Sequence, residues 1–211
     1  MLIDLRDAPL TERGLMNALV APRPVAWISS RDGEGRGNLS PFSHFTVASS
    51  APPVIVVSLN TPEDRPLKDT LLNAVETGVF AVNLVGAAQA SVMVASSAAL
   101  PRGEDEAAAQ GIAMEPCETI DCPRVAESPA TLECRLYKTM EIPPEMPGDS
   151  LSTLLFGRVV GIRLREEYLD ARGRFDGLRA GLVARGGGNQ YLAMEQVFEI
   201  AAPFRRVGNK A

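Results

Sequence analysis

The apolar positions of the chain occur in short runs separated by breaks rich in glycine and proline. The runs contain many Val, Ile and aromatic residues, which favour extended backbone. They predict strands at 25–30, 54–59, 79–84 and 191–200, a bent strand or loop at 38–47, and a hairpin formed by 130–140 and 153–165. The continuous apolar run at 54–59 indicates a strand that is buried on both faces.

Three segments have the pattern or composition of helices instead. They are 11–20, with Thr11 as N-cap; a segment capped by Asp64 that carries Leu67, Leu71, Leu72 and Val75 on one face and ends at Gly78; and 87–100. The segment 101–125 is predicted to be loop with short turns. Short strands with few helices predict one mainly β domain over residues 1–211, a barrel with helical decoration.

Composition and charge exclude several classes of function. The chain has 211 residues, of which 45% are hydrophobic and 22% charged, and its formal net charge is -5. An acidic chain is not expected to bind nucleic acid or an anionic membrane through its overall field. Residues 1–7 lack the basic and then apolar order of a signal peptide, and no stretch of about 18 apolar residues predicts a membrane helix.

The histidine and cysteine content narrows the chemistry further. His44 is the single histidine, which excludes zinc sites with two histidines, and no G-x-S-x-G motif accompanies it. We therefore expect no metal site and no Ser-His-Asp triad. Cys117, Cys122 and Cys134 are odd in number and form no C-x-x-C motif. We interpret them as small packing residues without a redox role and expect a cytoplasmic location.

Two polar clusters offer the donors that a bound phosphate requires. The stretch 65–70 surrounds a predicted helix start, where free N–H groups favour anions, and Lys68 adds a charge and Thr70 a hydroxyl. The stretch 38–44 offers hydroxyls and an amide beside a chain bend. Ordinary interpretations stay open for both: a solvated helix surface for the first, and a turn that caps its own backbone for the second.

A third cluster, 184–191, contains three consecutive glycines before Tyr191. Glycines let the backbone approach a flat ligand closely, and Tyr191 is placed to cover it, although a flexible hairpin has the same pattern. Neither this cluster nor the one at 33–37 satisfies G-x-G-x-x-G, so no Rossmann site is predicted. His44 is a candidate contact for a cofactor or substrate, with a structural hydrogen bond as the alternative.

Taken in order, seven segments resemble the flavin reductase-like, FMN-binding split-barrel family over about residues 15–204. They are 22–30, 38–43, 50–54, 68–78, 80–84, 157–161 and the stretch from the Gly186 cluster to Ile200. The resemblance implies a six-stranded antiparallel Greek-key barrel, usually as a homodimer. Two positions depart from the family pattern: no histidine precedes Gly157, and Arg185 is followed by a glycine where a leucine is typical.

The resemblance also implies a ligand, its binding residues and an activity. The FMN phosphate is expected near Ser40, Ser43, Lys68 and Thr70, and the flavin ring along the backbone of 47–50 and 59–60. The implied cofactor-binding set is Asn38, Ser40, Pro41, Phe42, Ser43, Val47, Ser49, Ser50, Leu59, Asn60, Arg65, Lys68, Asp69 and Thr70, with His44 and Tyr191 as candidate catalytic side chains. The implied activity is that of an NAD(P)H-dependent flavin reductase, with a monooxygenase as a possible recipient of the reduced flavin. An FMN-binding electron carrier without nicotinamide activity and an enzyme like pyridoxamine-phosphate oxidase stay open as alternatives.

Overall fold

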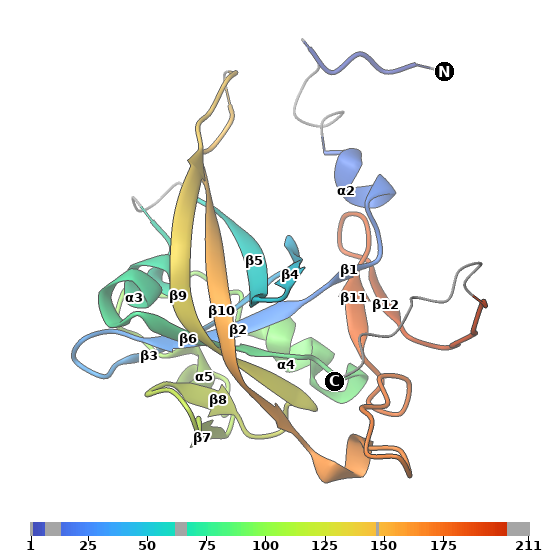
Figure 1. Ribbon diagram of the computed structural model, residues 1–211. Coiled ribbons are helices and arrows are strands. Elements are labelled where there is room, and N and C mark those ends of the chain that lie inside the picture. Colours follow the sequence, from blue (N-terminus) through green and yellow to red (C-terminus); the bar gives the residue numbers. More distant parts are fainter. Residues whose placement is uncertain (1, 7–13, 62–66, 147, 202–211) are drawn as a thin grey trace.

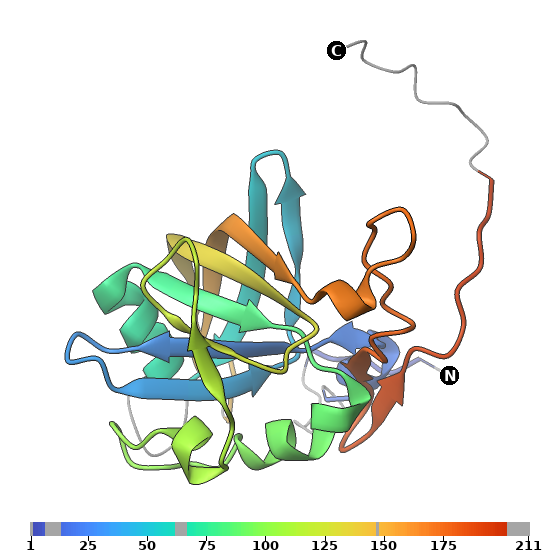
Figure 2. The same cartoon turned by 90° about the horizontal axis from the view of Figure 1, so that it is seen from below.

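A computed structural model describes residues 2–6, 14–61, 67–146 and 148–201. Its main body is an antiparallel β-barrel, and a small sheet and a short N-terminal helix stand beside the barrel (Figure 1). Seen from below, short helices lie against the face formed by β2 and β3 (Figure 2). No helix in these ranges is long and apolar enough to cross a membrane.

The barrel is a seven-stranded sheet with the order β3-β2-β6-β9-β10-β5-β4, antiparallel throughout. Its strands are β2 (Ala26–Arg31), β3 (Gly37–Phe42), β4 (Phe45–Ser50), β5 (Pro53–Asn60), β6 (Val79–Asn83), β9 (Ala130–Ile142) and β10 (Ser152–Leu164). The two edge strands, β3 and β4, are separated only by Ser43 and His44. One bent strand therefore supplies both edges of the sheet. When β3 and β4 are counted as one strand, the barrel has the six strands implied by the resemblance.

Alternation along the strands sends side chains into two large cores and one smaller cluster, formed by Val79, Ala81, Ile120 and Cys122. The core inside the barrel contains Ala26, Ile28, Ile55, Val57, Leu59, Leu71, Ala74, Phe80, Val82, Cys134 and Leu155. The core outside β2 and β3 contains Val25, Trp27, Leu39, Val85, Met93, Ala107 and Val125. Because neighbouring residues on a strand point to opposite faces, β2 is covered on both sides. In β5, by contrast, Val56 and Ser58 are only half-buried, so the prediction of burial on both faces is wrong for that strand.

Helix α3 (Asp69–Thr77) begins later than the sequence pattern predicts. Lys68 is its N-cap, with extended backbone, and Gly78 ends it with a φ of 74°. The predicted cap, Asp64, lies outside the described residues. The buried face of α3 includes Thr70 and Asn73, which hydrogen-bond to the first strands of the barrel, and this rotation leaves Val75 56% exposed.

The other helices are short. They are α2 (Met16–Leu19), α4 (Ala90–Ala95), α5 (Glu106–Ala109) and the single 3-10 turns η1 (Ala87–Gln89) and η2 (Glu166–Tyr168). The predicted helix at 87–100 thus ends early, and Thr11, the expected cap of the first helix, lies outside the described ranges. Helix α5 lies in a segment predicted to be loop, where Asp105 caps it by accepting hydrogen bonds from the N–H groups of Ala107 and Ala108.

Two small sheets complete the fold. One has the order β1-β11-β12, from Arg23–Pro24, Val183–Arg185 and Tyr191–Ala193; the other pairs β7 (Met114–Pro116) with β8 (Pro123–Val125). The predicted hairpin of 130–140 and 153–165 is confirmed as β9 and β10. The predicted last strand is wrong beyond Ala193, because 194–200 has no neighbouring strand and Ile200 is 82% exposed.

Candidate functional site

Two cavities lie side by side against β3, and Ser97 is part of the wall of both. The smaller one, about 60 Å³, is bounded by β3, the start of α3, the segment after α4 and α5. The larger one, about 490 Å³, is bounded by the end of β3, the bend after it, α2 and the β11–β12 hairpin. Residues from widely separated parts of the sequence thus form one continuous region.

The small cavity brings together five of the residues expected to bind the cofactor. They are Asn38, Ser40, Lys68, Asp69 and Thr70. Ser43, one of the four residues expected near the phosphate, lines the large cavity instead. The side-chain amide of Asn38 donates a 2.9 Å hydrogen bond to the Thr70 hydroxyl, which fixes the start of α3 against β3. The ammonium group of Lys68, the hydroxyls and the N–H groups at the start of the helix are donors that suit a phosphate group.

Glu106 also lines the small cavity, and the sequence analysis did not identify it. It is only 8% exposed, and its Oε2 accepts a 2.9 Å hydrogen bond from the backbone N–H of Leu39. Burial raises the pKa of Glu106, and the negative charges of Asp105 and Asp69 raise it further, whereas the Leu39 N–H favours the ionised form. A buried carboxyl group beside Lys68 makes the charge of this cavity dependent on pH.

The large cavity collects the other predicted residues near the barrel bend. Pro41, Phe42, Ser43, His44 and Tyr191 line it. Arg23 and Arg185 line it as well, and neither was expected. No Asp or Glu is among the lining residues in the part of the chain that the structure describes. The cavity therefore has a net positive wall.

Arg23 is the buried cation of this wall, with 9% of its surface exposed. Its guanidinium donates to the carbonyl oxygens of Val20 at 2.7 Å and Gly186 at 2.9 Å, and also to that of Asn17. Its Nε is buried without a hydrogen-bond partner, and no carboxylate of the described residues pairs with it. These contacts join α2 to the β11–β12 hairpin and place a positive charge in the wall of the large cavity.

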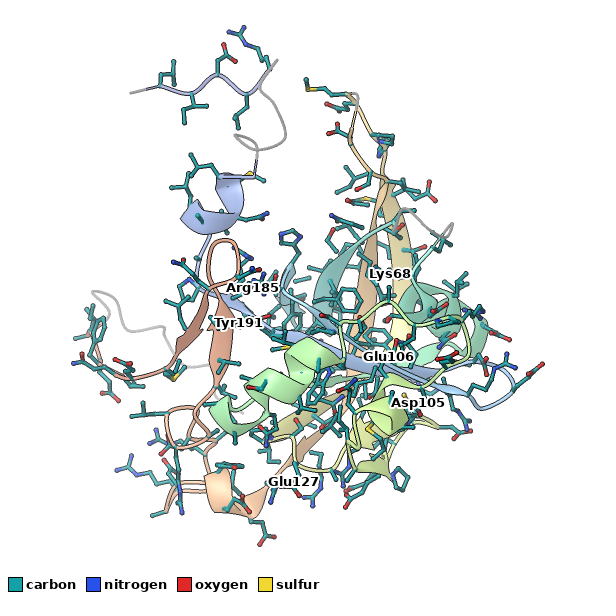
Figure 3. All side chains as sticks on the ribbon, turned by 180° about the vertical axis from the view of Figure 1, so that it is seen from behind. Lys68, Asp105, Glu106, Glu127, Arg185 and Tyr191 are labelled. Atoms are coloured by element: carbon teal, nitrogen blue, oxygen red, sulfur yellow. The ribbon has the colours of Figure 1, made fainter. Side chains whose placement is uncertain are left out.

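Arg185 and Tyr191 form the opposite side of the large cavity, where Figure 3 shows them together on the β11–β12 hairpin. The Arg185 guanidinium lies 4.6 Å from the centre of the Tyr191 ring and donates a 2.5 Å hydrogen bond to its hydroxyl. His44 Nε2 lies 2.9 Å from Asn17 Oδ1. Burial of the ring, and then the charge of Arg23, lower the pKa of His44, which favours the neutral imidazole.

The remaining predicted residues line neither cavity. Val47, Ser49 and Ser50 lie on β4, and Val47 is 63% exposed. Leu59 points into the barrel core, so only its backbone is available to a ligand, and Asn60 hydrogen-bonds to Ser152 at 3.1 Å. These five residues lie on the two strands of the β4–β5 hairpin.

Arg65 lies outside the described residues, so its predicted place beside the phosphate is not tested. Among the described residues, no group of three or more His, Cys, Asp or Glu is arranged to hold a metal ion.

Comparison with known proteins identifies the family. A model of the flavin reductase like domain matches residues 17–179. A Deinococcus radiodurans protein is 38% identical over 205 residues, which cover 93% of this chain and 87% of the relative.

Two solved structures are similar over nearly their whole length. Nitrilotriacetate monooxygenase component B from Bacillus cereus has a TM-score of 0.87 at 27% identity and covers 95% of this chain and 98% of its own. The Pseudomonas fluorescens 2-nitrobenzoate 2-nitroreductase NbaA has a TM-score of 0.82 at 28% identity and covers 99% and 100%. The chain belongs to the flavin reductase-like family and has its split-barrel fold. It is thus a flavin-binding protein of the oxidoreductase class.

Proposed function

We propose that the chain is an NAD(P)H-dependent flavin reductase that binds FMN across the two adjoining cavities. The observation that carries the proposal is that two cavities adjoin at Ser97, which lines both of them. One is small and polar and contains Lys68, and the other is larger and positively charged. A phosphate and a ring system joined by a short chain match this pair of spaces in polarity and in order.

The residues of the small cavity fit the phosphate of FMN. Lys68 supplies a positive charge, Ser40 and Thr70 supply hydroxyl donors, and the start of α3 supplies N–H groups. Glu106 opposes a phosphate when it is ionised and becomes a hydrogen-bond donor when it is protonated. The raised pKa of Glu106 shifts the balance toward the second state and so reduces the conflict.

The positive wall of the large cavity fits the second substrate. NADH and NADPH carry phosphate groups, and Arg23 and Arg185 face that cavity without a carboxylate in its described lining. Arginine pairs well with phosphate oxygens because its donors form a planar fork. The chain has no dinucleotide motif elsewhere, so we place the nicotinamide in this cavity, with its dissociation constant in the usual range of about 1 μM to 1 mM for a substrate.

In this proposal the side chains bind and orient and do not exchange protons with the substrate. Bound FMN supplies the chemistry of hydride acceptance, which the cofactor carries itself. Lys68 and Thr70 hold the phosphate, while Tyr191 and the neutral His44 position the nicotinamide. One histidine in the whole sequence is therefore sufficient.

The partners of the proposed reaction are a second copy of the chain and an enzyme that uses reduced flavin. We propose a homodimer in which the exposed β4 edge, with Val47, completes the flavin site. Light scattering at micromolar concentration tests this proposal, because a dimer has the mass of two chains. The similarity to component B of a monooxygenase supports supply of reduced flavin to a monooxygenase in the cytoplasm.

Anaerobic stopped-flow measurements on the FMN-loaded protein test the proposal. NADH or NADPH is expected to bleach the flavin absorbance faster than it reduces free FMN. If neither does, and dithionite or a protein donor still reduces the bound flavin, the chain is an FMN-binding electron carrier instead.

A further inference from the structure

The hairpin of β7 and β8 places two cysteines opposite each other. The paired residues are Met114 with Val125, Glu115 with Arg124 and Pro116 with Pro123. The next residue along each strand is a cysteine, and the N–H of Cys117 donates a 2.9 Å hydrogen bond to the carbonyl oxygen of Cys122. The two cysteines are therefore cross-strand neighbours that close the turn formed by residues 118–121.

This placement matches the geometry of a disulfide. Residues opposite each other in an antiparallel pair have Cα atoms about 4.5–5.5 Å apart, within the usual range for disulfides. The pair here has one of the two possible backbone bonds, because the N–H of Cys122 donates to the carbonyl oxygen of Ile120 instead. Both cysteines are free thiols, and the Cys117 side chain is near enough to Cys122 to raise the pKa of the Cys122 thiol. Formation of a bond between them requires no large movement of the backbone.

The turn between the two cysteines is already held in place. The buried carboxylate of Glu133 accepts hydrogen bonds from the N–H groups of Glu118 at 2.9 Å and Thr119 at 2.6 Å. These bonds lower the pKa of Glu133 in spite of its burial, so the carboxylate stays ionised and keeps the turn ordered. The two sulfur atoms thus stay close without a covalent bond.

The two thiols differ in their access to solvent. Cys117 is half-buried, Cys122 is only 4% exposed, and both line a surface cavity of about 380 Å³ together with Arg31. The hydrogen bond with Cys117, followed by burial, raises the pKa of Cys122, and the carbonyl oxygen of Ser29, 3.4 Å away, is a second acceptor for its proton. Cys122 therefore keeps its proton, and Cys117, the more accessible sulfur, is the one an oxidant reaches first.

We propose that Cys117 and Cys122 are a peroxide-sensitive thiol pair that closes to an intramolecular disulfide. Cys117 sulfur attacks one oxygen of hydrogen peroxide, the O–O bond breaks, water leaves, and Cys117 becomes a sulfenic acid. Cys122 sulfur then attacks the Cys117 sulfur, and its proton leaves with the hydroxyl group as a second water. One peroxide is reduced by two electrons, and two thiols become one disulfide.

Cys134 provides an internal control for this proposal. It lies in the barrel core with none of its surface exposed, and burial raises its pKa. Burial makes it inert to a soluble oxidant. All three cysteines pack in hydrophobic clusters, as the sequence analysis expects, and the proposal adds a redox role to Cys117 and Cys122 only.

Mass spectrometry of the full-length protein tests the proposal directly. Trypsin releases Cys117 and Cys122 in one peptide, 103–124, because no Lys or Arg lies between Arg102 and Arg124, and it releases Cys134 in another, 125–135. The reduced protein is treated with hydrogen peroxide, denatured, alkylated and digested. We expect peptide 103–124 to lose about 2 Da and take up no alkylating agent, whereas Cys134 remains fully alkylated. Dithiothreitol is expected to restore both thiols.

Two variants separate the roles of the sulfurs. In Cys122→Ser, Cys117 has no resolving partner, so a sulfenic acid that reacts with dimedone is expected in place of the disulfide. In Cys117→Ser, Cys122 is expected to stay reduced. The proposal is overturned if peptide 103–124 of the unmodified chain keeps two alkylated thiols after peroxide, or if the peroxide-treated chain forms only disulfides between molecules.

Discussion

The carboxyl group of Glu106 hydrogen-bonds to the backbone N–H of Leu39 and shares a 60 Å³ cavity with Lys68. An acid with a raised pKa in a proposed phosphate site couples ligand binding to protonation. The neutral acid tolerates a phosphate, and the carboxylate repels it. An anion bound there raises the pKa of Glu106 further, so binding takes up a proton.

FMN affinity is therefore expected to fall as the pH rises through the pKa of Glu106, which lies above its ordinary value of 4.5. Glu106→Gln is neutral at every pH and is expected to remove this part of the dependence. The phosphate of FMN itself ionises near pH 6, but this ionisation affects the unmodified protein and the Glu106→Gln variant equally. Fluorescence titrations across pH 5–8 measure the difference, and parallel curves for the two proteins would show that Glu106 is not coupled to the ligand.

Lys68→Ala is expected to weaken FMN binding about ten- to a hundredfold. A hydrogen bond to a charged group contributes about 1.5–3 kcal/mol, and each 1.4 kcal/mol changes affinity tenfold. Riboflavin lacks the phosphate, so its affinity is expected to stay constant. Lys138→Ala is the matched control, because Lys138 lies over the Phe156 ring and lines neither cavity. Equal losses for FMN and riboflavin would remove Lys68 from the phosphate site.

Arg185→Gln is expected to raise the KM for NAD(P)H by about tenfold, because it removes a charge-assisted contact and leaves a polar side chain. FMN affinity is expected to change less than the KM, because the phosphate of FMN is proposed to lie in the small cavity, which Arg185 does not line. Arg174→Gln removes a charge from an exposed pair with Asp170, away from the cavity, and serves as the control. Steady-state kinetics at several salt concentrations measure both variants. An unchanged KM in Arg185→Gln would place the nicotinamide elsewhere.

Gly157→Ala is expected to destabilise the barrel by about 1–3 kcal/mol, the usual cost of overpacking. A Cβ at this position would lie 2.5 Å from Cζ of Phe80 and 3.1 Å from Cβ of Cys134. Urea denaturation measures the loss of unfolding free energy. Phe80→Leu in the same chain makes room for the methyl group, so the double variant is expected to lose less than the sum of the single losses. Strict additivity would show that the two residues do not clash.

Local patterns were sufficient for most strands of the barrel and for the polar clusters, because each depends on neighbouring residues, but they missed β7 and β8 in a segment predicted to be loop. They were insufficient for Arg23, which follows Pro22 and resembles a helix stop, while its contact with Gly186 joins residues 163 positions apart. Glu106 was missed for the same reason, since its partner Leu39 is 67 positions away. For the segment 194–200, the sequence predicted a strand that the structure does not contain. Its composition favours a strand, but no partner strand lies beside it.

The bend at Ser43 and His44 connects the two edge strands of the barrel sheet, and the same two residues line the larger cavity. An inserted residue there would shift β3 and β4 relative to each other and so change the alignment of both sheet edges at once. Closure of the barrel and the shape of the ligand cavity therefore depend on the same two residues. Substitutions in the loops around the cavity can alter its shape alone, whereas an insertion at the bend alters the strand alignment of the barrel as well.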